Sequence, residues 1–419
     1  MAAAPAQLLP VLLLACTWPL FVGSRARGAP AAAAGLHPVV LLPGYSCSQL
    51  DARLTDEFEP STAPSCGARR GKGWFRLWQN HTALQEDPAL APCYSELLRL
   101  VYDPAVGDYR NLPGVETRVV SFGTTRGFGT GDPAAKHWKE SGYREGENLF
   151  GAPYDFRYAP APPGVASGVF SYFLSSLRAL VEQASERNGN KPVILVSRLG
   201  ALHANPELPG VAREVRQALR HGLHRCRRRR APAAAVRWPV SVSTHRRPPV
   251  VRQHHEELRD HALWPAVAEG VRLFGHAPLV ITRAKNYSAY DIVEYLVASG
   301  FSDGEAARYV TRVLPVALNF GAPGVPMTCI NGVGVPTAEK LVYWDGDFSA
   351  KPEVVYGDGD GSINIQSILA LDTFIGADPA QDYFKSLLIH NTSHVGVVSD
   401  DYALRRLVNE VLEANRAID

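Results

Sequence analysis

Two polar loops near the C-terminus carry side chains that could act together as an acid–base pair. Asp360 lies in the glycine-rich run 356–362, between a strand-like and a helix-like segment. His394 follows the apolar run 387–389 in a second loop. A carboxylate that accepts a hydrogen bond from an imidazole fixes its tautomer and stabilises the imidazolium formed during acyl transfer. The pattern predicts Asp360 as the acid and His394 as the general base.

Other interpretations of these loops remain open. Two aspartates that alternate with glycine also occur in calcium loops and in plain turns, although the D-G-D-G spacing lacks the further ligands and the glutamate of a calcium loop. A loop histidine considered alone is usually a surface residue. The succession of an acidic loop and then a histidine loop favours the catalytic interpretation, and it calls for no metal.

The serine that such a pair would activate is missing from its expected turn. A buried-strand run, 192–197, leads directly into Arg198, Leu199 and Gly200. Serine hydrolases place the nucleophile in G-x-S-x-G or a related motif, at a sharp turn from a strand into a helix. Arg198 stands two residues before Gly200, where that serine belongs. The sequence therefore describes a serine hydrolase with a damaged centre, and Ser197 is a candidate displaced nucleophile.

The same chemistry requires backbone N–H groups that face the developing negative charge. The turn that follows the first apolar run offers one such donor at Tyr45. The residue after the nucleophile supplies the second donor, which in this chain falls near Leu199. These two positions are the candidate oxyanion hole.

The elements that would position these loops alternate between strand and helix. Alternation of this kind predicts an α/β fold with a mostly parallel sheet covered on both faces. Ser302 and Glu305 form a capping box at the start of one further helix. Strands are expected at 37–42, 117–120, 193–196, 279–282, 325–330, 354–356 and 384–390, and helices at 170–181, 288–297, 366–374 and 402–414.

Length and composition favour one large domain with a cap, because 419 residues with 46% hydrophobic content can bury a large core. The apolar run 8–22 is short, is interrupted by proline and precedes small residues, so residues 1–28 are predicted as a signal peptide and 29–419 as the domain. An N-terminal membrane anchor is the alternative. The formal net charge of +2 indicates no particular partner.

Cys66 and Cys93 bracket a segment that contains Trp74 and Trp78. If the chain is secreted, this pair could close the segment as a disulfide loop, and the alternative is two unpaired buried thiols. Five cysteines remain after the predicted signal, so at least one thiol has no partner cysteine. The tryptophans could belong to an exposed lid or to ordinary core packing.

A basic segment, about 198–272, departs from the alternating pattern. Seven of the 13 histidines lie between His203 and His261, and arginines crowd residues 225–230. We favour translation of a wrong reading frame or a mis-spliced exon, and a basic linker is the simpler alternative. A nucleic-acid insert lacks the interleaved aromatic residues, and a zinc site lacks the second histidine, since Arg259 stands in its place.

The chain resembles the lecithin:cholesterol acyltransferase family, which includes lysosomal phospholipase A and plant relatives. The matching blocks span about 37–197 and 273–415. They include V-V-L-L-P-G with Q-L-D-A, the loop 66–93, the specific run G-A-P-Y-D-F-R at 151–157, the strand 192–197 and the loops of Asp360 and His394. The family strand continues as S-H-S-L-G-G with the second serine as nucleophile, so Ser197 aligns with the first serine.

This resemblance implies an α/β-hydrolase with a cap and a disulfide-closed lid that acts on glycerophospholipid esters through an acyl-enzyme, with no metal or cofactor. Asp360, His394 and Tyr45 take the roles given above, and Trp74 and Trp78 lie in the lid that touches lipid. The partners implied are a phospholipid or lipid surface with peripheral membrane contact, and no nucleic acid. Residence would be secreted, vacuolar or lysosomal. The rival hypotheses are an inactive secreted lipid-binding protein and a frameshifted gene product.

Overall fold

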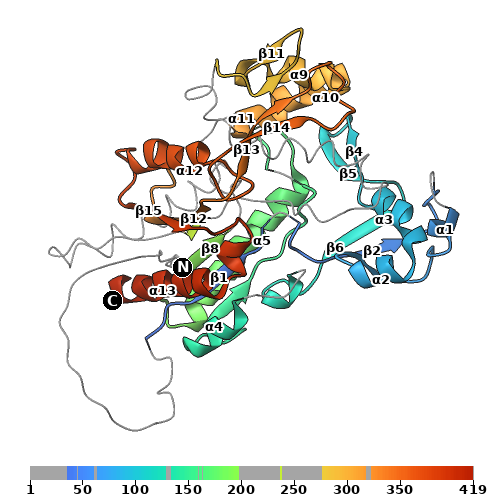
Figure 1. The fold of residues 1–419 in the computed structure, drawn as a ribbon. Coiled ribbons are helices and arrows are strands. Elements are labelled where there is room, and N and C mark those ends of the chain that lie inside the picture. Colours follow the sequence, from blue (N-terminus) through green and yellow to red (C-terminus); the bar gives the residue numbers. More distant parts are fainter. Residues whose placement is uncertain are drawn as a thin grey trace.

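We analysed a computed structural model of the chain (Figure 1). The structure describes residues 35–44, 46–60, 64–128, 134–158, 160–162, 164–197, 236–237, 276–317 and 322–418. The predicted signal peptide, Tyr45, Leu199 and all of the basic segment except residues 236–237 lie outside these ranges. Among the described residues, no helix is both long enough and apolar enough to cross a membrane.

A six-stranded sheet forms the centre of the protein, and every neighbouring pair of its strands is parallel. In spatial order the strands are β15 (Phe384–His390), β12 (Met327–Val333), β9 (Val236–Arg237), β8 (Ile194–Ser197), β1 (Val39–Leu42) and β7 (Leu149–Gly151). The strands are short, and β1, β7, β8 and β12 are almost wholly buried, as expected for a parallel sheet covered on both faces.

Helices pack on both faces of this sheet (Figure 1). Alternate residues of β1 divide between two cores: Val40 and Leu42 face α5 (Gly168–Arg187), whereas Val39 and Leu41 share a core with α13 (Asp401–Ile418). A further helix, α4 (Ala135–Glu140), packs beside α13. The helix α12 (Ile365–Leu371) and the π-helical turn η9 (Asp372–Gly376) pack over β12. This two-layer covering confirms the predicted α/β class.

Three smaller sheets accompany the central one. The four-stranded sheet has the order β11 (Asn286–Tyr287), β10 (Val280–Ile281), β13 (Thr337–Val342) and β14 (Glu353–Gly357). The three-stranded sheet has the order β3 (Phe75–Trp78), β2 (Leu50–Leu54) and β6 (Val115–Val119). In the two-stranded sheet, β4 (Leu100–Asp103) pairs with β5 (Asp108–Asn111). The strands predicted at 117–120, 279–282 and 354–356 therefore exist, but they do not join the main sheet. Apolar periodicity alone cannot distinguish which sheet a short strand joins.

Short helices complete the chain, and the predicted capping box is present. The Ser302 side chain accepts from the Glu305 backbone at the start of α10 (Asp303–Arg308), and the Glu305 carboxylate bonds Ser302 in return. The remaining helices of the described residues are α1 (Pro64–Gly67), α2 (His81–Glu86), η1 (Pro88–Leu90), α3 (Ala91–Leu97), η2 (Thr125–Gly127), η7 (Ala289–Asp291), α9 (Ile292–Ala298), η8 (Tyr309–Val313), α11 (Leu314–Ala317) and η10 (Gly396–Val398).

The strand β9 is a finding that the sequence pattern did not predict. Its two residues pair with β8 on one side and with β12 on the other, so they connect the two halves of the sheet. A two-residue strand is too short to produce a recognisable alternation of apolar residues. The segment in which we expected no strand therefore contributes one to the sheet.

Candidate active site

The structure brings the predicted acid and base together. Nδ1 of His394 lies 2.7 Å from Oδ2 of Asp360, and both side chains are almost fully buried. An ionised carboxylate can only accept a hydrogen bond, so Nδ1 carries the proton and the basic lone pair of the imidazole lies on Nε2. This geometry matches the one in which a carboxylate orients a histidine for proton transfer.

The loop of Asp360 holds the carboxylate in this orientation. Its second oxygen, Oδ1, accepts hydrogen bonds from the backbone N–H groups of Ser362 (2.9 Å) and Ile363 (2.7 Å). The backbone N–H of His394 also donates to the carbonyl of Asp360 at 2.7 Å. The acid and the base are therefore joined twice, once through side chains and once through the backbone.

Two neighbouring residues that sequence reasoning missed fix this arrangement. Gly332, near the end of β12, lies so close to the 392 loop that a Cβ atom on it would approach the Thr392 carbonyl to 2.0 Å. Asp358 accepts from the Gly334 backbone N–H at 2.7 Å and so attaches the acidic loop to the end of β12. A glycine inside a strand signals the close approach of another backbone, and this signal could have identified Gly332.

Ser197 occupies a different part of the sheet. It is the last residue of β8 and is 9% exposed. The strand register places it level with Arg237 of β9 and Cys329 of β12. At about 4.8 Å between strands and about 3.3 Å per residue, Ser197 lies roughly 10 Å across the sheet from β12 and roughly 10 Å short of the level of Gly332. Its proposed role as a displaced nucleophile stays a prediction.

The candidate oxyanion donors Tyr45 and Leu199 lie outside the described residues. Ser46, which follows Tyr45, is held in place by a hydrogen bond from Trp78. The indole N–H of Trp78 donates to the Ser46 carbonyl at 2.7 Å. The Trp78 ring packs against Phe156, with 5.6 Å between ring centroids. Trp78 therefore ties the loop that follows β1 to the segment that follows β7, and it is half-buried rather than extended into solvent.

Trp74, which immediately precedes β3, contacts two arginines of the neighbouring strands β2 and β6. The guanidinium carbons of Arg53 and Arg118 lie 5.1 and 4.3 Å from the centroids of its rings. Cations over an aromatic face are attracted by the ring quadrupole. The half-buried Trp74 is thus held by two arginines, and its proposed contact with lipid stays a prediction.

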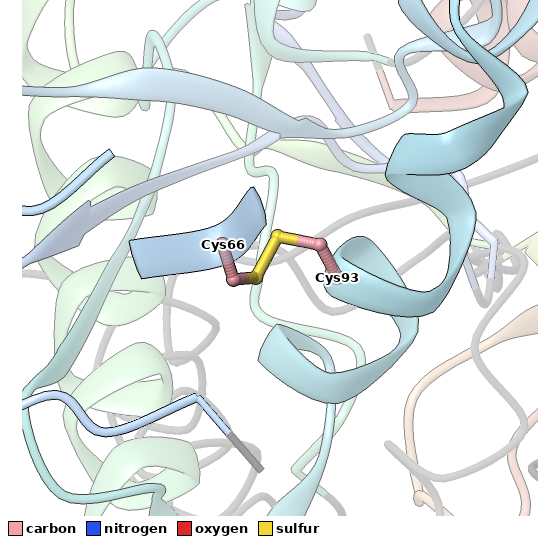
Figure 2. Close-up of a disulfide and its surroundings, with 2 residues drawn as sticks. All are labelled: Cys66 and Cys93. Atoms are coloured by element: carbon pink, nitrogen blue, oxygen red, sulfur yellow. A yellow bond between two sulfur atoms is a disulfide. The ribbon is translucent and has the colours of Figure 1, made fainter. Parts of the chain in front are cut away.

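Cys66 and Cys93 form the disulfide that the sequence allowed (Figure 2). The bond links α1 to α3, and both cysteines are fully buried. They belong to a compact core that also contains Leu54, Leu77 and Leu97. The open alternative of two unpaired thiols is therefore wrong. Cys47 is a half-buried free cysteine.

The G-A-P-Y-D-F-R run places a buried ion pair after β7. Arg157 donates to Asp155 at 2.6 Å and to the Thr117 hydroxyl at 2.7 Å. Burial alone would lower the pKa of the Arg157 guanidinium, but the charge and the hydrogen bond of Asp155 raise that pKa above its usual value. Burial also raises the pKa of Tyr158 to about 12. These residues stabilise the loop that follows β7.

No cluster of histidine, cysteine and acidic side chains suited to a metal ion occurs among the described residues. The candidate site is a buried Asp–His pair at the carboxyl edge of the parallel sheet. Open α/β sheets bind their ligands at this edge. The class defined by fold and site is therefore an α/β protein with a buried Asp–His pair at the carboxyl edge of its parallel sheet.

Comparison with known proteins identifies the family. The profile of the family "Lecithin:cholesterol acyltransferase" matches residues 74–205. The lecithin-cholesterol acyltransferase-like 1 protein of Oryza sativa subsp. japonica is 41% identical to this chain, and the match covers 92% of this chain and 88% of that protein. The protein of the same name in Arabidopsis thaliana is 34% identical, and the match covers 91% of each chain. The lysosomal phospholipase A and acyltransferase of Canis lupus familiaris is 28% identical, over 91% of this chain and 93% of its own. The chain belongs to the lecithin:cholesterol acyltransferase family.

Proposed function

We propose that this protein is a lipid acyl hydrolase or O-acyltransferase for glycerophospholipid esters, and that its catalysis is impaired. The observation that carries the proposal is the buried pair of Asp360 and His394, with its 2.7 Å hydrogen bond, in a chain of this family. The relatives named above support the substrate class, because their names specify lecithin or phospholipid and acyl transfer. The α/β-hydrolase fold of the family is consistent with the six-stranded parallel sheet.

The proposed reaction uses a serine, a histidine and an aspartate. Nε2 of His394 takes the proton from a serine hydroxyl while the serine oxygen attacks the ester carbonyl. The oxyanion that forms is stabilised by backbone N–H groups, for which Tyr45 and Leu199 are the candidates. Collapse of this intermediate breaks the ester bond, and the proton returns to the departing lipid alcohol. Water or an acceptor alcohol then removes the acyl group by the reverse sequence.

Impairment follows from the position of the serine. Arg198 stands where the motif requires the nucleophile, and the register of Ser197 supports a large separation from the end of β12. In a serine protease, loss of the nucleophile costs about 10⁶ in turnover, although the remaining site retains some activity. We therefore propose that Ser197 is a poor substitute nucleophile.

Labelling with a soluble fluorophosphonate tests this proposal. We expect slow labelling that reaches much less than one adduct per chain and that disappears in both Ser197→Ala and His394→Ala variants. A serine at another position would be identified by mass spectrometry of the adduct. Rapid, stoichiometric labelling would contradict the impairment, and labelling that persists in His394→Ala would contradict the role of the acid–base pair.

A second candidate function is lipid binding without chemistry. The arginine at the motif position favours it, because a complete absence of nucleophile leaves only the binding surface. The absence of any adduct in the same labelling experiment, together with binding of phospholipid vesicles, would favour this candidate. A frameshifted product is distinguished by sequencing the transcript across the codons for residues 195–275.

We propose in addition that the chain has the lid, the cap, the membrane contact and the residence that are typical of the family. The disulfide loop 66–93, with Trp74 and Trp78, serves as a lid at the lipid surface, and the four-stranded sheet with α9 and α10 serves as the cap. Contact with the membrane is peripheral, and residence is secreted, vacuolar or lysosomal. The lysosomal relatives support that residence. The reaction as proposed needs no metal and no cofactor.

A further inference from the structure

We propose that a second surface, formed by Val106, Val169 and Tyr172, docks the protein on a zwitterionic phospholipid bilayer. This inference rests on the proposed function, since it supplies the surface on which lipid esters would be met. Val106 is 63% exposed, Val169 40% and Tyr172 76%. None of the three belongs to the disulfide loop that contains Trp74 and Trp78. We call these three residues the valine–tyrosine patch.

One arginine brings the members of the patch together. The guanidinium of Arg312, on η8, donates to the Gly107 carbonyl and to the Ala166 carbonyl, each at 2.6 Å. Val106 precedes Gly107 at the tip of the β4–β5 hairpin, and the first turns of α5 begin just after Ala166. Segments that are far apart in the chain are therefore held within the span of a single side chain.

A second bond fixes the start of α5 against the hairpin. Asp108 accepts from the Gly168 backbone N–H at 2.8 Å through one carboxylate oxygen and from Arg312 at 3.0 Å through the other. Val169 and Tyr172 are three residues apart on α5, so they lie on one side of the helix. The patch is thus rigid before it meets a ligand, which reduces the entropy lost on binding.

The position of the patch suits a lipid enzyme. α5 follows β7, and the Phe173 ring packs on Tyr154 in the intervening loop, 5.2 Å between centroids. The first turns of α5 therefore lie at the carboxyl edge of the parallel sheet. His394 follows the carboxyl end of β15 in the same sheet. A protein resting on the patch would present this edge, rather than the opposite one, to the lipid.

The charges near the patch indicate which membrane it suits. Arg312 and Asp108 pair with each other and are largely buried, so they offer no free charge to a lipid headgroup. Tyrosine favours the interface between headgroup and acyl chain, because its ring is apolar and its hydroxyl is polar. Arg110 and Asp103 of the same β4–β5 hairpin also pair with each other, so both ion pairs beside the patch are neutral overall, and a neutral phosphatidylcholine surface accepts the apolar side chains without an electrostatic cost.

Sedimentation with phosphatidylcholine vesicles tests the inference on the full chain. We compare wild type with a Val106→Ser, Tyr172→Ser double variant, and we expect the partition coefficient to fall at least five-fold, which corresponds to about 1 kcal/mol. Tyr402→Ser is the matched control, because Tyr402 is 73% exposed on α13, on the opposite face of the sheet. This control should bind as wild type does. Equal melting temperatures would show that all three proteins fold.

Several outcomes would overturn the inference. Unchanged binding of the double variant would do so, as would an equal loss in Tyr402→Ser or a failure of the wild type to bind vesicles. A change in elution on size-exclusion chromatography, with vesicle binding intact, would assign the patch to a contact between protein copies. Since sedimentation requires no chemistry, and the fluorophosphonate requires no membrane, the two proposals can fail separately.

Discussion

The main sheet carries its chemistry-bearing residues at two places that are held very differently. At the ends of β12 and β15, the side chains of Asp360 and His394 are buried, paired and reinforced by backbone bonds from both loops. At the end of β8, Ser197 pairs with Leu42 of β1 on one side and with Arg237 of the two-residue strand β9 on the other. The acid–base end is fixed by side-chain and backbone hydrogen bonds between two loops, whereas Ser197 is placed by the strand pairing of β8.

Under the proposed function, this difference means that the two halves of a catalytic site can be lost independently. A buried carboxylate that accepts three hydrogen bonds contributes to folding as well as to chemistry, so its geometry persists for structural reasons. A nucleophilic serine on an exposed turn contributes to chemistry and little to folding. The presence of an intact Asp–His pair is therefore weaker support for activity than the presence of the serine would be.

The largest expected effect comes from Asp360→Ala. The change leaves the backbone N–H groups of Ser362 and Ile363, and Nδ1 of His394, without the carboxylate that they bond. Removing one partner of a buried, hydrogen-bonded pair costs about 3–5 kcal/mol. We expect the free energy of unfolding, measured by urea denaturation with circular dichroism, to fall by that amount.

Ser197→Ala is the matched control at the other end of the sheet. It removes one hydroxyl, and the loss of a typical hydrogen bond costs about 1 kcal/mol. If the two variants lose equal stability, the contrast between the two ends is wrong. A loss in Asp360→Ala of less than about 1 kcal/mol would equally contradict the structural role of the carboxylate.

Gly332→Ala should have the next largest effect, because it disturbs the same end without removing any catalytic group. The new Cβ would meet the Thr392 carbonyl at 2.0 Å, so the loop that carries His394 must move. Overpacking of this kind costs about 1–3 kcal/mol. We expect that loss in urea denaturation, together with a shift of the His394 ring resonances in the NMR spectrum.

Gly304→Ala provides the control for this glycine. Gly304 lies in α10, where a Cβ would meet only the end of the flexible Arg308 side chain, at 3.4 Å. Alanine in place of glycine inside a helix stabilises by about 0.5–1 kcal/mol. The two substitutions should therefore change stability in opposite directions, and an unchanged His394 resonance in Gly332→Ala would refute the proposed displacement.

The sequence predicted the acid–base end better than the nucleophile end for physical reasons. The helix near 402–414 has a long, strongly periodic pattern and the strand 384–390 contains a continuous apolar run, and the structure has β15 at Phe384–His390 and α13 at Asp401–Ile418. The Asp360–His394 bond could be predicted because both residues follow strands. β9 has too few residues for any periodicity, and the attachment of β14 to a separate sheet depends on tertiary contacts that no local pattern encodes.

The smallest effect tests whether the opposite, amino-terminal part of β15 lies beside an unfavourable charge. Burial raises the pKa of Asp372, on η9, although a hydrogen bond from Ser386 of β15 opposes this. Its Oδ1 atom is buried without a hydrogen bond. Because the folded protein binds this proton more tightly than the unfolded chain does, stability decreases as the pH rises from the ordinary aspartate value, near about 3.9, through the raised pKa.

Asp372→Asn should therefore flatten this part of the pH dependence. The amide keeps a polar group beside Ser386 but carries no charge, so the variant should gain stability relative to wild type as the pH rises from 4 towards 7, as urea denaturation would measure. Asp347 gives the opposite sign, since hydrogen bonds from Ser349 lower the pKa of its carboxyl. The stability that Asp347 contributes is present above its ordinary pKa and is lost as the pH falls through the lowered value. An Asp347→Asn variant should thus lose stability relative to wild type at neutral pH, and parallel profiles for the two variants would contradict the environment assigned to Asp372.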